Sequence, residues 1–89
     1  RALSLARFHD VPFLLDSLPA IANAVPDVGA HMDFTRMGMC GHSFGALTTQ
    51  VMAGQLYPDE AEQLASLYEA RVAAGILYSF VPVSHLTAA

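Results

Sequence analysis

Apolar positions in the first part of the chain recur at helical spacing. The stripe predicts a helix over residues 10–23, and its members are Val11, Leu14, Leu15, Leu18, Ala22 and Val25. Asp10 is a suitable N-cap, and Pro12 is compatible with the first turn of such a helix. Pro19 removes a backbone hydrogen bond and clashes with the preceding turn, so we expect a kink or an early end there. Residues 26–29 (PDVG) are typical of a loop.

The hydrophobic pattern in the middle of the chain changes twice within 20 residues. Residues 34–40 predict a short strand, and the glycines of residues 41–45 predict a tight turn. A helix is expected from Phe44 to Met52, with Leu47, Val51 and Met52 facing inward and Gly54 near its C-cap.

Two further elements are expected towards the C-terminus. Pro58, followed by two acidic residues, is typical of a helix start, so a helix is predicted over residues 58–71. Its expected inward positions are Ala61, Leu64, Ala65 and Tyr68. Residues 72–81 form a continuous apolar run that suits a strand buried on both faces of a parallel sheet, ended by Pro82. Two strands joined through helices indicate an α/β fold with a right-handed crossover.

Composition narrows the class of protein. The 89 residues are 54% hydrophobic, which excludes a disordered segment. With eight acidic and four basic residues, the chain lacks the cluster of positive charge that nucleic-acid binding requires. No apolar run reaches the roughly 18 residues that span a bilayer. We interpret residues 1–89 as part of one α/β domain, incomplete at both ends. Strands from the interior of a larger sheet would explain why so short a chain is so hydrophobic.

One motif carries chemistry. Residues 41–45 (GHSFG) fit G-x-S-x-G, the nucleophile elbow, in which a sharp strand-to-helix turn exposes a serine hydroxyl. The turn forces Ser43 into a strained conformation. Positions 41 and 45 are expected to require glycine (Gly41 and Gly45), because the neighbouring backbone would leave no room for a side chain. The backbone N–H of Phe44 and the start of the following helix would face a developing oxyanion.

The context of this motif resembles a known superfamily. Residues 36–46 (RMGMCGHSFGA) look like the elbow region of α/β-hydrolases. Residues 7–18 (RFHDVPFLLDSL) resemble the helix before the elbow in the dienelactone hydrolase-like and platelet-activating-factor acetylhydrolase-like branch. The likeness covers residues 7–54 well and residues 72–82 loosely, with residues 58–71 as an inserted helix.

This resemblance implies a serine hydrolase of small-molecule esters, without metal or organic cofactor. Ser43 would be the nucleophile, forming a covalent acyl intermediate, and the Phe44 amide would be one oxyanion donor. The second donor would lie outside this chain. Relatives can carry the triad acid at the end of the strand after the elbow, where this chain has Ser79. The acid is therefore expected beyond Ala89, with the histidine further on, and we interpret His85 as a loop residue.

Two alternatives stay open at this point. The same elbow would serve an acyltransferase that uses an alcohol or amine in place of water. A hydrolase-like module without its triad would serve binding alone. Beside the nucleophile, we expect His42 to point away from the substrate face in a packing or covering role, and Cys40 to be a small buried apolar residue.

Overall fold

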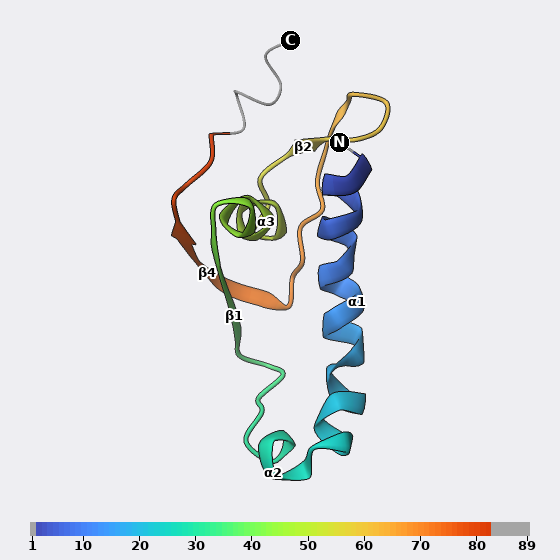
Figure 1. Ribbon diagram of the computed structural model, residues 1–89, viewed down its shortest axis with the longest axis vertical. Coiled ribbons are helices and arrows are strands. Elements are labelled where there is room, and N and C mark those ends of the chain that lie inside the picture. The colour runs from blue at the N-terminus through green and yellow to red at the C-terminus, as the bar shows by residue number, and fades with distance from the viewer. Residues whose placement is uncertain (1, 83–89) are drawn as a thin grey trace.

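The computed structural model describes residues 2–82 and contains three helices and four strands (Figure 1). In chain order they are α1 (Ala2–Ala24), α2 (Pro26–Gly29), β1 (Met37–His42), α3 (Phe44–Met52), β2 (Tyr57–Pro58), β3 (Leu64–Ala65) and β4 (Val72–Tyr78).

The two long strands form a parallel pair. β1 lies beside β4, with Cys40 opposite Ile76 and His42 opposite Tyr78 at the carboxyl end. The connection between them contains α3 and a small antiparallel hairpin made of β2 and β3. Parallel strands require such a crossover connection, so the expected mixed α/β character and the parallel pairing are confirmed.

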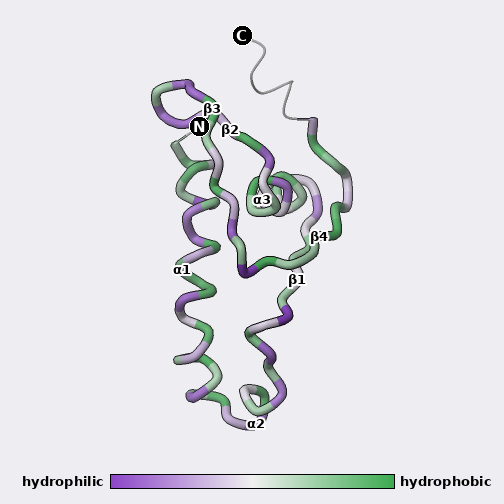
Figure 2. Tube along the Cα trace, turned by 180° about the vertical axis from the view of Figure 1, so that it is seen from behind, coloured by the Kyte–Doolittle hydropathy of each residue, from purple (hydrophilic) through white to green (hydrophobic). Residues whose placement is uncertain are grey.

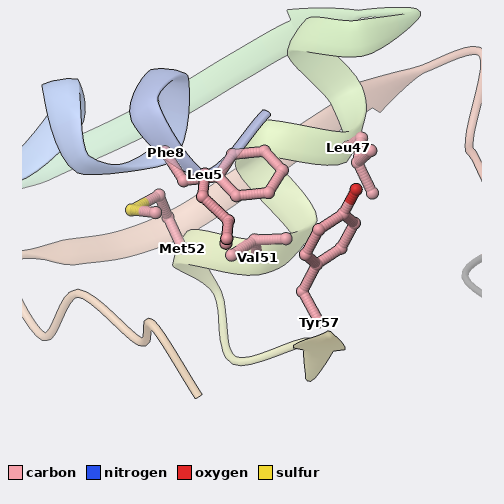
Figure 3. Close-up of a cluster of buried hydrophobic side chains, with 6 residues drawn as sticks. All are labelled: Leu5, Phe8, Leu47, Val51, Met52 and Tyr57. Atoms are coloured by element: carbon pink, nitrogen blue, oxygen red, sulfur yellow. The ribbon is translucent and has the colours of Figure 1, made fainter. Parts of the chain in front are cut away.

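Helix α3 has the bounds predicted for it and packs directly on the sheet. A Cβ placed on Gly75 of β4 would lie 2.9 Å from Cγ2 of Thr49, so helix and strand are in close contact there. Leu47, Val51 and Met52 of α3 are buried, as predicted. They form a hydrophobic cluster with Leu5 and Phe8 of α1 and Tyr57 of β2 (Figure 3).

Helix α1 differs from the prediction at both ends. It begins at Ala2, so Asp10 lies inside the helix and is not its N-cap. The helix extends towards the N-terminus because Leu5 and Phe8 continue the apolar stripe by one more turn and pack against α3. It also continues past Pro19 to Ala24, so the expected early end is wrong. Residues 26–29, predicted as a loop, form the short helix α2.

Residues 58–71 do not form the predicted helix. The carboxylate of Asp59 accepts hydrogen bonds from the amides of Ala61 and Gln63, at 2.9 and 3.0 Å, and closes the β2–β3 hairpin. Such side-chain bonds compete with helical backbone bonds, and Glu62 adopts a φ of 62° that breaks a helix. The expected inward residues Leu64 and Tyr68 are consequently exposed.

Strand β4 is shorter and less covered than predicted. It ends at Tyr78, because Ser79 has a φ of 62°, and not at Pro82. Only Val72 of this strand is buried, so the expected burial of both faces is not found. Figure 2 shows that β4 is nonetheless largely hydrophobic along its length. One face of the β1–β4 sheet carries α3, and the described residues leave the opposite face open.

Candidate active site

Ser43 stands at the junction between β1 and α3 in a strained backbone conformation. Its φ of 58° and ψ of −114° lie outside the regions that residues with a side chain normally adopt. A strained residue of this kind costs about 1–3 kcal/mol and persists only where the surroundings impose it. The predicted strand, turn and helix are therefore present, but the strand spans Met37–His42 and not residues 34–40, and the turn is confined to Ser43.

Backbone contacts on both sides hold this turn. The Ser43 amide donates to the carbonyl oxygen of Tyr78, at the end of the neighbouring strand, over 3.1 Å. The Ser43 carbonyl accepts from the Leu47 amide, also at 3.1 Å, as the first hydrogen bond of α3. Ser43 is thus tied to the sheet through its amide and to the helix through its carbonyl.

The two glycines of the motif differ in their surroundings. A Cβ on Gly41 would lie 2.1 Å from the Gly45 carbonyl oxygen and 2.8 Å from the Ala46 nitrogen, both backbone atoms. Only glycine fits at position 41, as predicted. A Cβ on Gly45, in contrast, would meet nothing within 4 Å among the described residues. Among the described residues, the expectation that a side chain at position 45 would be crowded is therefore wrong. The close approach to Gly41 is made by the backbone of Gly45.

The hydroxyl of Ser43 is available for chemistry. Serine at a helix N-cap usually accepts a hydrogen bond from an amide of the first turn. Here Ser43 makes no such capping bond, and the residue is exposed to solvent. Phe44 is the first residue of α3, and amides in the first turn have no intrahelical acceptor. The exposed Ser43 therefore directly precedes the N-terminus of α3.

A second strained serine follows the neighbouring strand. Ser43 and Ser79 each come one residue after the paired ends of β1 and β4, and both have a positive φ. Ligands of open parallel sheets bind outside the carboxyl ends of the strands. Ser79, which stands where the sequence resemblance implied that an acid could lie, is therefore at the same sheet edge as Ser43.

Residues next to the elbow divide between the two faces of β1. His42 and Cys40 lie on the open face, opposite Tyr78 and Ile76, and both are exposed. For His42 this places the side chain on the sheet face away from α3, whereas its expected packing or covering role away from the substrate face stays a prediction. For Cys40 the prediction of burial is wrong, because within residues 2–82 no element covers that face. His85 lies outside the described residues.

Two residues that support the site were not identified from the sequence. Phe8 of α1 is fully buried and stacks on the Phe44 ring, with centroids 5.8 Å apart and planes 9° apart. Gln50 of α3 is 6% exposed and bonds the backbone of Val81. The signals were present: Phe8 continues the stripe by helical spacing, and Gln50 is a polar residue three positions after the inward Leu47.

Charged groups with perturbed pKa values lie outside residues 41–45. Hydrogen bonds from Arg71 lower the pKa of Glu69 to about 2, and the same Arg71 donates to Asp16 of α1 at 2.7 Å. The Thr35 hydroxyl and amide hold the pKa of Asp33 below its usual value. The Arg71–Asp16 pair ties the loop before β4 to α1, whereas the Asp33–Thr35 pair lies within the loop before β1.

Residues 2–82 contain no group of three or more side chains suited to hold a metal ion. Over the same residues, no helix is both long and apolar enough to cross a membrane. No family model, curated protein or solved structure matches this chain. The interpretation of the site therefore depends on its own geometry.

Proposed function

We propose that Ser43 is the nucleophile of a serine hydrolase of the α/β-hydrolase type, acting on small-molecule esters. The observation that carries this proposal is the conformation of Ser43. It is a strained, exposed serine at a strand-to-helix junction, and its hydroxyl is not used to cap the helix. Strain of this kind is concentrated at functional sites, and this junction suits a nucleophile elbow.

The reaction would proceed in two halves. Ser43 Oγ attacks the ester carbonyl carbon while a base takes the hydroxyl proton, and the tetrahedral oxyanion accepts a hydrogen bond from the Phe44 amide. Collapse expels the alcohol, which takes the proton, and leaves an acyl group on Ser43. Water then attacks the acyl group with the same base, releasing the carboxylic acid and the free serine.

The general base and its acid partner come, in this proposal, from residues outside 2–82. Within the described residues, the Ser43 hydroxyl has no hydrogen bond to a histidine. In α/β-hydrolases the acid and the histidine follow the serine in the sequence. The first oxyanion donor is local to the elbow, whereas the second comes from another loop.

A fluorophosphonate probe on the full-length protein tests the assignment. We expect a covalent adduct on Ser43, located by peptide mass spectrometry, and no labelling of Ser43→Ala. Ester turnover by Ser43→Ala should fall by roughly 10⁵-fold or more. Ser17→Ala, which removes a serine of α1 that bonds only the Phe13 carbonyl, should label normally. An adduct on Ser79, or undiminished turnover by Ser43→Ala, would refute the proposal.

Product analysis belongs to the same experiment. The elbow would serve transfer to an alcohol or amine as well as to water, because both acceptors attack the same acyl-Ser43. Turnover in the presence of a competing alcohol should yield mainly the free acid if the protein is a hydrolase. A binding module without a triad would show neither labelling nor turnover.

A further inference from the structure

The chain that follows β4 is fixed at two points on either side of a short corner. Before the corner, the Tyr78 carbonyl accepts the Ser43 amide hydrogen bond. After it, Gln50 Nε2 donates to the Val81 carbonyl at 2.7 Å, and Gln50 Oε1 accepts from the Val81 amide at 3.0 Å. The Val81 side chain also packs against the hydrophobic cluster. Only Ser79 and Phe80 lie between these anchors.

The contact between Gln50 and Val81 is partly buried and satisfies both polar groups of the Gln50 side chain. Gln50 is 6% exposed, and burial of a side-chain amide is costly unless its polar atoms are bonded. Both are satisfied, and both by one residue 31 positions away in the chain. A paired contact of this kind fixes a backbone segment in position and orientation, as one strand does for another.

The corner contains an exposed aromatic residue, Phe80, close in sequence to the carbonyl that holds the Ser43 amide. Phe80 is 62% exposed, and it comes two residues after the carbonyl bonded to the Ser43 amide. Phe44, directly after the nucleophile, is 42% exposed. Apolar surface therefore occurs both in the elbow and in the segment fixed beside it.

Building on the proposed function, we infer that Gln50 is a positioning residue that holds Phe80 as one wall of the acyl-binding side. The substrates that this wall recognises are esters with an apolar acyl chain of several carbons. The ring would bury part of that chain when acyl-Ser43 forms, whereas an acetyl group has no chain beyond its methyl group for the ring to cover. Gln50 itself does not touch the substrate, and it acts only by fixing Val81 and hence the corner.

The test compares p-nitrophenyl hexanoate with p-nitrophenyl acetate on the full-length protein. The measured quantity is the ratio of their kcat/KM values, which does not depend on the fraction of active enzyme. Phe80→Ala should lower the ratio by about tenfold, the discrimination that contacts to one or two methylenes provide. Because the ring is exposed, this variant is expected to fold normally.

Gln50→Met keeps the length of the side chain but removes both bonds to Val81, and it should lower the same ratio. The double variant should show no larger shift than Phe80→Ala alone, because both changes act through one wall. Tyr68→Ala removes an equally exposed ring from another loop, and Val51→Ala weakens the core of the same helix. Neither control should change the ratio.

The outcomes separate the two proposals. If the probe labels Ser43 in every variant but Phe80→Ala leaves the ratio unchanged, the wall is refuted and the hydrolase stands. If Gln50→Met leaves the ratio unchanged while Phe80→Ala lowers it, the positioning role of Gln50 is refuted. If the parent protein is not labelled on Ser43, the proposed function itself fails.

Discussion

The ring of Phe8 lies parallel to the ring of Phe44, so the first helix contacts the residue that directly follows Ser43. Phe8 also meets the edge of Tyr57 in a T-shaped contact, with centroids 4.9 Å apart. Aromatic pairs of these geometries stabilise a fold beyond the area they bury. Phe8 therefore joins α1, the elbow and the hairpin strand β2.

Truncation of Phe8 should lower both stability and labelling. Phe8→Ala leaves a cavity under the elbow and is expected to cost about 3–5 kcal/mol in urea unfolding of the full-length protein. The rate of fluorophosphonate labelling should fall as well, because Phe44 loses the ring that positions it. Phe13→Ala, at a ring of the same helix that is 72% exposed, should cost under about 0.5 kcal/mol. Equal losses for the two variants would contradict this role.

The glycines of the motif should respond in opposite ways to alanine. Gly41→Ala places a Cβ against backbone atoms of Gly45 and Ala46 that cannot move aside, so we expect a loss of at least about 2 kcal/mol and of Ser43 labelling. Gly45→Ala has room within the described residues and lies in the first turn of α3, where alanine favours the helix by up to about 1 kcal/mol. Thermal unfolding and probe labelling measure both. A tolerated alanine at position 41 would mean that the turn is not constrained in this way.

Acid should weaken the fold through Glu69. Hydrogen bonds from the Arg71 side chain and amide lower the Glu69 pKa from its usual 4.5 to about 2. Below pH 4.5 the unfolded chain takes up a proton that the folded chain does not, so this contribution is present above pH 4.5 and is lost as the pH falls towards 2. Arg71 remains charged throughout, since its pKa is raised above an already high value.

Glu69→Gln tests this pH dependence. The difference in unfolding free energy between the parent protein and the variant should be largest above pH 4.5 and should vanish near pH 2. Asp33→Asn should show a difference that is lost in acid in the same direction, because hydrogen bonds from Thr35 also lower the Asp33 pKa, but this loss does not depend on Arg71. A Glu69→Gln difference that stays constant over this range would show that the pair contributes nothing.

Residues 1–89 produced alone should self-associate. Each of β1 and β4 has one strand partner within residues 2–82, and the sheet face away from α3 exposes Ile76 and Tyr78, at 58% and 55%. Unpaired strand edges with apolar side chains promote pairing between chains. Size-exclusion chromatography should show species larger than a monomer, and Ile76→Lys should reduce them. A monomer with one sharp unfolding transition would contradict the expectation.

Local signals in the sequence determined the centre of this fold. The turn at Ser43 and the bounds of α3 were predictable because their causes lie within a few residues. These causes are an apolar strand, a position that only glycine fits, and a helical stripe of apolar residues. The pairing of β1 with β4 was predictable because two apolar runs joined through a helix favour parallel strands.

Only the tertiary structure decided the rest, because its causes lie far apart in the chain. Whether residues 58–71 form a helix or a hairpin depends on competition between Asp59 and the helical backbone, together with burial of Tyr57 against Phe8. The length of α1 depends on Leu5 and Phe8 finding α3. The anchor from Gln50 to Val81 spans 31 residues, and hydropathy patterning contains no information about such a polar contact. Long-range packing and paired polar groups therefore set what local preference left open.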